Sequence, residues 1–320
     1  MLHPLDSAAG EQLLAAVVRN TLPVRLVEAV AANLPALTYL RSALEDLEHI
    51  PPSLQRSTTE LAIQTALAPA AMAIHGWASK DVETACSRAH ELAVELNDAT
   101  SMFLSAWGLW THYFLRGEMD LAIAAAQSVD TMATASGSIS LLVAADHAVG
   151  FTLYFRGDLA AALERAKAGA ARFDEDIERT TVRMFQFSST TAMYSFAAPS
   201  LWMTGHEEEA DAALERALSL PKELAHAPSI AFSFGFNSLL LLHRSEWTRV
   251  RDYSLRTVAL CQEEGFQMWL PLAQALIGLC DAAEGRFESG FAVAFEALDR
   301  FAATGTGVCQ SHVHAPIASS

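Results

Sequence analysis

The chain has 320 residues, of which 52% are apolar and only 18% are charged, a composition that excludes a disordered tail and a highly charged coiled coil. Its formal net charge of −16 disfavours broad, non-specific binding to nucleic acid or to an anionic membrane surface. The four cysteines are scattered without a CxxC pair, which argues against a disulfide scaffold and favours a reducing compartment.

The first 38 residues are expected to form an N-terminal helical segment, with helices at 10–19 and 24–33 that are separated by Pro23. No basic region followed by an apolar region opens the chain, so no signal peptide is predicted. No apolar stretch approaches the roughly 20 residues that a membrane-spanning helix needs. We therefore expect a soluble cytoplasmic protein without a membrane partner.

Three further helices are predicted before residue 100, at 37–48, 58–74 and 80–96. Pro51 and Pro52 end the first of them, and the turn at 75–77 closes the other two into a hairpin. Ser79 is a plausible N-cap for the helix at 80–96, with Glu83 near the position of a capping box.

An internal repeat occupies most of the remaining chain. In each copy an apolar helix leads into a small turn residue, which suits a helix C-cap because glycine enters the left-handed region without a Cβ penalty. The copies are separated by 40, 48, 40 and 40 residues, and a nearly fixed period of this size is typical of a stacked helical repeat. The turn residues are Gly117, Gly157, Gly205, Ser245 and Gly285.

Small residues recur at two positions around each turn, where they let the two helices of a hairpin cross closely. Seven residues before the turn four of five side chains are small, and five residues after it all but one are Ala or Gly. The later set is Ala122, Ala162, Ala210, Val250 and Gly290, and the earlier set is Trp110, Gly150, Ala198, Ser238 and Gly278. The eight extra residues of the 48-residue step are expected around 172–183, as a solvated loop or a helix extension.

These spacings resemble the tetratricopeptide (TPR) pattern over five units, roughly residues 100–302. The period of about 40 residues is longer than the 34 of that family, and the helix-terminating proline is mostly missing, although Pro221 is placed after the third hairpin. We predict an all-α fold, a TPR-like α–α superhelix of stacked antiparallel helix hairpins. The predicted organisation is an N-terminal helical segment at 1–38, a repeat solenoid at 39–302 and a flexible tail at 303–320.

Several ordered strings carry a closer resemblance, which spans about residues 35–305. They include Ile74-His-Gly-Trp77 and Ala106-Trp-Gly-Leu-Trp110, and the full set lies at 40–47, 50–52, 59–70, 74–83, 92–98, 106–110 and 264–270. In order and spacing these strings are similar to the TPR-like C-terminal region of bacterial adenylate/guanylate cyclase–AAA ATPase fusion proteins. The resemblance implies a regulatory or signalling context.

Neither enzymatic activity of those fusion proteins is expected on this chain. It has no GxxxxGK[ST] phosphate-binding loop, no GxGxxG, no HExxH and no GxSxG, and no segment has the strand-rich character of a cyclase domain. We predict no catalytic residue, no cofactor and no metal. The acidic stretch 206–209 is expected to be the first turn of a helix, and Cys309, His312 and His314 form at most a weak cluster in the tail. Cys261 and Cys280 are expected to be buried.

A partner-binding surface is the stronger hypothesis, because in TPR hairpins the first helix lines the concave groove. Transferring the groove positions of that family predicts an aromatic surface suited to a protein or peptide segment. The alternative is that the same side chains pack between neighbouring hairpins, as Trp110 and Trp269 are expected to do. The predicted groove residues are Trp107, His147, Phe151, Tyr154, Trp202, Phe232 and His243.

Three functions therefore stay open. The first is a non-enzymatic interaction or regulatory scaffold related to cyclase and ATPase signalling proteins, whose charge favours basic or neutral partner segments. The second is a small-molecule sensor that uses the groove. The third is a truncated fragment of a larger signalling protein, since no polar capping helix closes the repeat array in the sequence.

Overall fold

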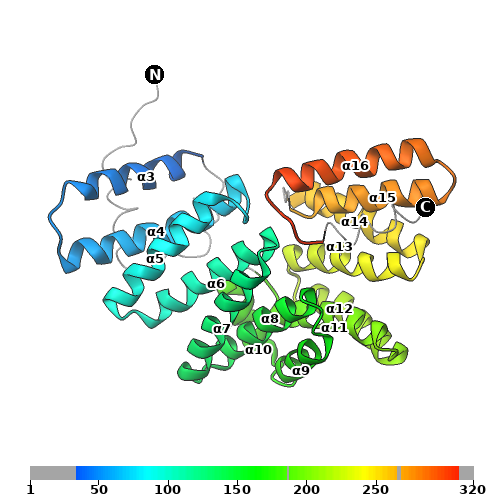
Figure 1. The fold of residues 1–320 in the computed structure, drawn as a ribbon, viewed down its shortest axis with the longest axis horizontal. Coiled ribbons are helices and arrows are strands. Elements are labelled where there is room, and N and C mark those ends of the chain that lie inside the picture. Colours follow the sequence, from blue (N-terminus) through cyan, green and yellow to red (C-terminus); the bar gives the residue numbers. More distant parts are fainter. Residues whose placement is uncertain (1–33, 186, 265–267, 310–320) are drawn as a thin grey trace. The chain divides into compact units, whose positions relative to one another are not determined.

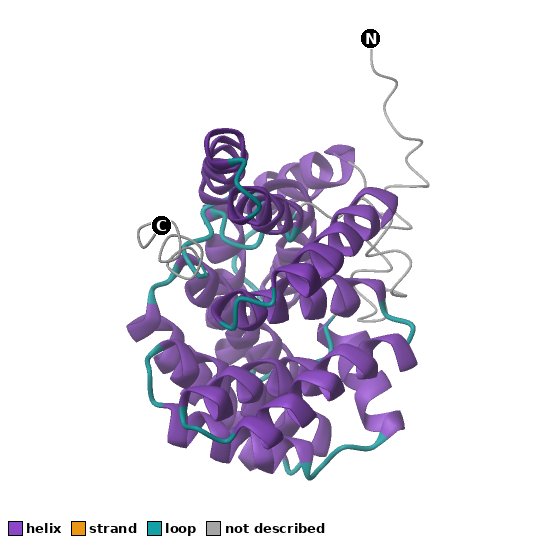
Figure 2. Ribbon diagram, turned by 90° about the vertical axis from the view of Figure 1, so that its right-hand side faces the viewer, coloured by secondary structure: helices purple, strands orange, loops and turns teal. Residues whose placement is uncertain are grey.

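The computed structural model describes residues 34–185, 187–264 and 268–309, which form fourteen α-helices and no strand (Figures 1 and 2). The all-α prediction is confirmed over this part of the chain. The helices expected at 10–19 and 24–33 lie outside the described residues. The chain divides into two compact units, residues 1–113 and 114–320, and each unit is described by itself.

In unit 1 the helices are α3 (Leu34–Glu48), α4 (Leu54–His75), α5 (Lys80–Leu96) and all but the end of α6 (Ala99–Arg116). Helix α4 packs against both α3 and α5, and the predicted hairpin closes at Gly76, whose φ is +84°. Ser79 occupies the N-cap position of α5 as expected, but its hydroxyl makes no capping hydrogen bond. The capping-box prediction is therefore wrong, because Glu83 bonds to other side chains of unit 1.

Unit 2 consists of helix pairs that follow one another along the chain. Adjacent helices pack as the hairpins α8/α9, α11/α12, α13/α14 and α15/α16. Its helices are α7 (Met119–Ser136), α8 (Ile139–Phe155), α9 (Leu159–Ala170), α10 (Glu175–Phe185), α11 (Ser189–Met203), α12 (Glu207–Glu223), α13 (Ala227–His243), α14 (Trp247–Glu264), α15 (Leu270–Ala283) and α16 (Phe287–Ala303). The sequence analysis placed Pro221 after the third hairpin. That placement is wrong, because Pro221 lies inside the last turn of α12.

All five predicted turn residues have a left-handed backbone, which confirms the repeat and its period. The φ angles are +79° at Gly117, +83° at Gly157, +85° at Gly205, +58° at Ser245 and +93° at Gly285. This region carries a penalty for residues with a Cβ, so glycine at four of the five turns has a direct conformational reason.

The small residues that follow each turn are buried. Ala122, Ala162 and Ala210 are fully buried. At the last hairpin the contact involves backbone, since a Cβ added at Gly278 would lie 2.6 Å from the carbonyl oxygen of Gly290. The sequence rule that small residues permit close helix crossing is confirmed here.

The 48-residue step contains an additional helix, α10, between α9 and α11. The sequence located the insertion correctly but described it as a solvated loop or a helix extension. That description is wrong for one side of α10, because Glu178, Thr181 and Phe185 are buried. Helix α10 is thus a packed element of unit 2.

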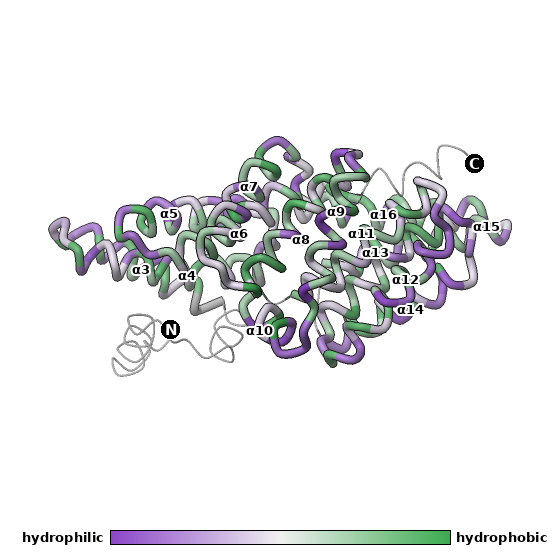
Figure 3. The backbone as a smooth tube through the Cα atoms, turned by 90° about the horizontal axis from the view of Figure 1, so that it is seen from below, coloured by the Kyte–Doolittle hydropathy of each residue, from purple (hydrophilic) through white to green (hydrophobic). Residues whose placement is uncertain are grey.

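The two helices of each hairpin differ in burial. The first helices α8, α11 and α13 are buried on almost every face. The second helices α9, α12 and α14 bury only one face, which consists mostly of small residues. Hydrophilic and hydrophobic residues alternate along the second helices (Figure 3). The first helices therefore form the inner layer of unit 2. Among the described residues, no helix is both long enough and apolar enough to cross a membrane.

Candidate functional site

The inner layer of unit 2 gathers an aromatic cluster around Phe151. The centroid of its ring lies 4.7 Å from that of Phe114, 5.3 Å from that of Phe236 and 5.6 Å from that of Phe196. Phe232 joins this cluster through Phe236, at 5.4 Å between centroids. Contacts of this geometry stabilise a core beyond the burial of apolar area alone.

Three predicted groove residues belong to this buried cluster. The exposed fractions are 3% for His147, 6% for Phe151 and 1% for Phe232. Each therefore has an evident packing role, which is the alternative that the sequence left open. Their role in binding stays a prediction, since their side chains present almost no surface to a partner.

Burial also fixes the chemistry of His147. The ring stacks on Phe187 at 5.6 Å between centroids, and Nδ1 lies 3.3 Å from the hydroxyl of Ser189. Burial lowers the pKa of His147 to about 3, because the cation would have to leave water. His147 is consequently a neutral side chain of the core at physiological pH.

The other three predicted residues of unit 2 line one pocket. Tyr154, Trp202 and His243 lie near the C-terminal ends of α8, α11 and α13, the first helices of three successive hairpins. The pocket has a volume of about 210 Å³ and an almost entirely apolar wall. Its remaining lining residues are Ser195, Pro199, Met203, Phe236, Leu239 and Leu240.

The few polar groups at this pocket are uncharged or occupied. The Ser195 hydroxyl donates to the carbonyl of Thr191 at 2.8 Å and accepts from the amide nitrogen of Asn237 at 3.0 Å. Burial raises the pKa of the Tyr154 phenol, with a smaller contribution from Cys309, and burial lowers the pKa of His243. The pocket is therefore neutral near pH 7 and suits an apolar group.

Beside the pocket, Arg244 holds the indole of Trp202. Its guanidinium carbon lies 5.9 Å from the indole centroid, and the same group bonds to Asp211 at 2.5 Å. A cation over an indole face restrains the ring. This contact orients one wall of the pocket.

Trp107, the seventh predicted groove residue, lies in unit 1 and does not line this pocket. It is buried, and its ring centroid lies 4.7 Å from that of Trp110. Trp110 is itself buried, as predicted, so the two indoles form a packing pair of α6.

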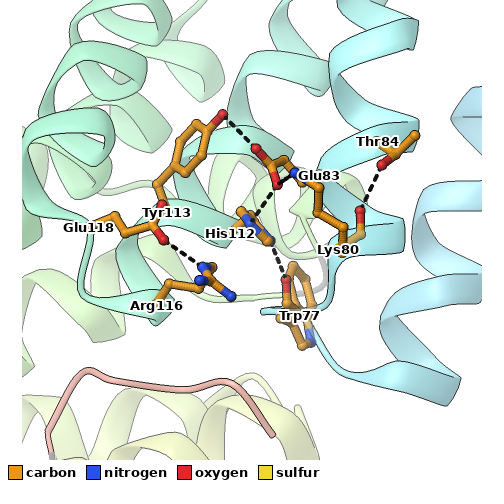
Figure 4. Close-up of polar contacts among 8 residues, drawn as sticks. All are labelled: Trp77, Lys80, Glu83, Thr84, His112, Tyr113, Arg116 and Glu118. Carbon is orange, nitrogen blue, oxygen red and sulfur yellow. Dashed lines mark hydrogen bonds and ion pairs between the residues drawn. The ribbon is translucent and has the colours of Figure 1, made fainter.

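A polar cluster in unit 1 was missed by the sequence analysis (Figure 4). The buried ring of His112 lies between the carbonyl oxygen of Trp77, 3.3 Å from Nδ1, and the Glu83 carboxylate, 3.7 Å from Nε2. Glu83 also bonds to Lys80 at 2.6 Å and to the Tyr113 hydroxyl at 3.4 Å. The hydrogen bond from Lys80 is the main reason that the pKa of Glu83 is lowered.

This cluster ties α5 to α6. Only the Lys80–Glu83 spacing could have been found in the sequence, as a helical ion pair. His112 and Tyr113 come from another helix, and no local pattern predicts their approach. Figure 4 also shows Arg116 bonded to Glu118 at 2.7 Å, a contact of unit 2 across the turn at Gly117.

A buried carboxylate in unit 2 has a structural explanation as well. Asp146 of α8 bonds to Arg165 at 3.2 Å and to Arg172, and Arg165 also binds Asp130 at 2.8 Å. Removing a carboxylate from water costs several kcal/mol, and two guanidinium groups offset part of that cost. The network links α7, α8 and α9.

The described residues contain no group of three His, Cys, Asp or Glu side chains placed to hold a metal ion. Of the weak cluster noted in the sequence, Cys309 is buried, and His312 and His314 lie outside the described residues. Cys261 and Cys280 are buried as predicted, and burial raises the pKa of each thiol to about 11. Thiols with so high a pKa are poor nucleophiles.

No protein-family model matches the chain. It is 24% identical over 268 residues to an uncharacterized protein of Rhizobium meliloti (strain 1021), a match that covers 82% of this chain. The match covers only 26% of that protein, so the chain spans about a quarter of its relative's length.

Two solved structures share the fold. The apo form of RapI superposes with a TM-score of 0.55 at 11% identity, over 83% of this chain and 91% of that one. A Rap protein complexed with competence and sporulation factor gives a TM-score of 0.56 at 15% identity, over 98% of this chain and 79% of that one. At such identities the likeness establishes the TPR-like helical-repeat fold.

Proposed function

We propose that this chain is a protein-interaction module whose apolar pocket holds one side chain of a partner segment. The pocket between α8, α11 and α13 carries the proposal, because three of the predicted groove residues converge there. Buried apolar anchors in such pockets supply most of the binding energy of many interfaces.

The volume of the pocket favours a side chain over a small molecule. Sites for drug-sized ligands usually measure about 300–1,000 Å³ and contain a few convergent polar groups. This pocket measures about 210 Å³, and its wall is almost entirely apolar. An aliphatic or aromatic side chain matches these dimensions better than the ligand of a sensor domain.

Two further observations support the proposal. A Rap protein of the same fold has been solved in complex with competence and sporulation factor, so this architecture accommodates a bound factor. The net charge of −16 favours a basic or neutral partner segment over an acidic one.

We also propose a relation to the repeat region of cyclase–ATPase fusion proteins, on the strings quoted above. The length of the Rhizobium relative is compatible with this relation, since the matched stretch is 26% of that protein. In such a setting the module would link a partner to a signalling domain on a longer chain.

The test is a selection of linear peptides from a random phage-displayed library on the purified chain, followed by fluorescence anisotropy of the best binders. Substitution of a rim residue should separate pocket binding from binding elsewhere. Met203 is 50% exposed, so Met203→Glu adds a carboxylate at the rim with little effect on folding. We expect selected peptides to share an apolar anchor and to bind this variant at least about tenfold more weakly.

Leu121→Glu is the matched control, because Leu121 is also 50% exposed in unit 2 but does not line the pocket. It should bind the selected peptides like the wild type. Peptides that bind Met203→Glu as tightly as the wild type, or a selection without any enriched sequence, would contradict the proposal. Phe151→Ala is unsuitable as a test, since it removes the centre of the aromatic cluster.

A further inference from the structure

In unit 2, each helix that follows a repeat turn packs against the first helix of the next hairpin. Helix α7 packs against α8, α9 against α11, α12 against α13 and α14 against α15. Helix α16 follows the last turn, at Gly285, and its main packing partner among the described helices is α15 of its own hairpin (Figure 1). In the part of the chain that the structure describes, no further hairpin follows to take the place of a next first helix.

Ion pairs identify the side of such a helix on which the next hairpin lies. Four carboxylates of α7 and α12 bond to an arginine of the following hairpin, at 2.5–3.1 Å. They stand three, six, ten and thirteen residues after their turns, a spacing that places them on one face of a helix. The pairs are Asp120–Arg156, Asp211–Arg244, Glu215–Arg249 and Asp130–Arg165.

The same four positions of α16 carry Glu288, Phe291, Phe295 and Leu298, which are called the end stripe here. Phe291 is half-buried and Phe295 is 46% exposed, although the corresponding positions of α12 carry ion-paired carboxylates. Helices α9, α12 and α14 contain no phenylalanine at all. The end stripe therefore offers an apolar surface to a further helix, with one carboxylate near its N-terminal end.

Glu288 indicates the charge that such a helix should carry. It corresponds to Asp120 of α7, whose partner Arg156 caps the C-terminal end of α8. Glu288 is exposed, and no described side chain forms an ion pair with it. A basic residue near the C-terminus of an antiparallel helix would complement Glu288 and would also suit the dipole of its own helix.

A second copy of α16 does not meet this requirement. The end stripe is symmetric about its midpoint, so antiparallel packing of two copies would place Leu298 opposite Glu288. Arg300, the one arginine of α16, lies on another face of the helix and bonds to Gln274 at 2.9 Å. The net charge of −16 also opposes self-association.

We propose that the end stripe docks an amphipathic α-helix of a partner protein in the place of a next first helix. The docked helix runs antiparallel to α16, with apolar side chains on Phe291 and Phe295 and a basic residue opposite Glu288. The apolar pocket is a separate surface, because its lining residues come from α8, α11 and α13. The end stripe is thus a second interaction site, which does not depend on the pocket.

The test is a selection from a phage-displayed library of leucine–alanine helices about five turns long, like α16. The library is randomised on the apolar face and at one position of the last turn, and is first depleted on Phe295→Gln, which removes ligands of other surfaces. Phe295 is exposed enough for this neutral substitution to fold normally. We expect enriched peptides to carry Arg or Lys in the last turn and to bind the wild type at least about tenfold more tightly than Phe295→Gln in fluorescence anisotropy.

Charge reversal tests the role of Glu288. Glu288→Arg should weaken binding of the basic peptides, and the same peptides with glutamate in the last turn should bind this variant better than the wild type. Leu255→Gln is the matched control, because Leu255 stands ten residues after its turn, as Phe295 does, and is 52% exposed, but α15 already packs against its helix. Leu255→Gln and the pocket variant Met203→Glu should both bind the peptides like the wild type.

Three results would overturn the proposal: a selection without enriched peptides, peptides that bind Phe295→Gln as tightly as the wild type, and a last-turn preference that Glu288→Arg does not reverse. Sedimentation velocity of the wild type and of Phe295→Gln adds a fourth. A dimer that this substitution dissociates would identify a second copy as the occupant of the end stripe. Because Met203→Glu alters the pocket and Phe295→Gln alters α16, failure of one site is distinguishable from failure of the other.

Discussion

His147 shows how position in the repeat and local chemistry lead to different conclusions. Its spacing from the turn predicted a groove residue, yet it stacks on Phe187 inside unit 2 and is 3% exposed. The imidazole is tolerated there because it is neutral and lies near the Ser189 hydroxyl. Protonation, and not polarity as such, is what the site opposes.

This predicts a pH-dependent contribution to stability. The folded-state pKa of about 3 lies below the ordinary value of 6.5, so between these values the unfolded chain binds a proton that the folded chain refuses. Stability is therefore unaffected by His147 above pH 6.5 and declines as the pH falls through this window. His147→Phe keeps an aromatic ring but cannot be protonated. The free energy of unfolding should therefore fall by about 2 to 3 kcal/mol less in this variant than in the wild type between pH 7.5 and pH 4.5.

The measurement is urea denaturation of both proteins at the two pH values, with each protein at pH 7.5 as its own reference. Carboxylates and the half-buried His226, whose pKa is also lowered by burial, contribute equally to both curves. Parallel losses of stability in wild type and variant would show that His147 does not carry the effect.

At the scale of the element, the helix α10 depends on one buried carboxylate. Glu178 is 1% exposed and accepts from Ser188 Oγ at 2.5 Å and from Thr190 Oγ1 at 2.5 Å. These bonds join the inserted helix to the N-terminus of α11. A helix of eleven residues is marginal alone, so its stability comes from such tertiary contacts.

Glu178→Ala should therefore release α10 from unit 2. The buried Thr190 hydroxyl loses its bond to Glu178, at a cost of about 1–3 kcal/mol if it stays unpaired, whereas the Ser188 hydroxyl keeps a bond to Thr191 Oγ1 at 2.6 Å. Local release of α10 avoids that cost. We expect trypsin to cleave at Arg179 and Arg183 well before the other sites, as read by mass spectrometry. Glu175→Ala is the control, because its exposed ion pair with Arg179 contributes little to stability, and it should be cleaved like the wild type.

Local signals in the sequence predicted the hairpins well. Glycine at a helix end encodes its own conformation, so the turns at Gly117, Gly157, Gly205 and Gly285 were found by spacing alone. The helix boundaries of unit 1 followed from Pro51 and from the turn at 75–77 within a few residues. Each of these features depends on side chains that are neighbours along the chain.

The candidate site was predicted only in part, because burial of the inner layer depends on distant segments. The pattern selected aromatic side chains of the first helices, but whether such a ring faces a groove or a core depends on what covers it. Phe187, which lies between α10 and α11, packs against Phe232 of α13. No spacing rule relates such segments, so Tyr154, Trp202 and His243 were not distinguishable from Phe151.

At the scale of the whole molecule, stability should be divided among neighbouring hairpins. In a helical-repeat protein each unit contacts mainly its sequence neighbours, and stability approximates a sum of unit and nearest-neighbour terms. Helix α15 packs extensively against α16 and against α14 of the preceding hairpin, whereas α13 and α15 barely meet. A defect in the last hairpin is therefore expected to stay near it.

Gly278→Ala creates such a defect, since the new Cβ would lie 2.6 Å from the carbonyl oxygen of Gly290 and 2.8 Å from the amide nitrogen of Ala294. All of the clashing atoms are backbone atoms of α16, which leaves no side chain to move aside, so we expect a cost of about 1–3 kcal/mol. Gly235→Ala is the matched control inside a helix, because its nearest new contact is 3.7 Å and helix propensity favours alanine by up to about 1 kcal/mol.

Hydrogen exchange resolved by segment decides whether the loss is local. In Gly278→Ala the amides of α15 and α16 should exchange faster, and Cys280 should react with maleimide before Cys86 does. Helices α4 and α5 should keep their wild-type protection, because they belong to the other compact unit. Equal acceleration across α4, α5, α15 and α16 would instead reveal one cooperative unit, in which the hairpins cannot unfold separately.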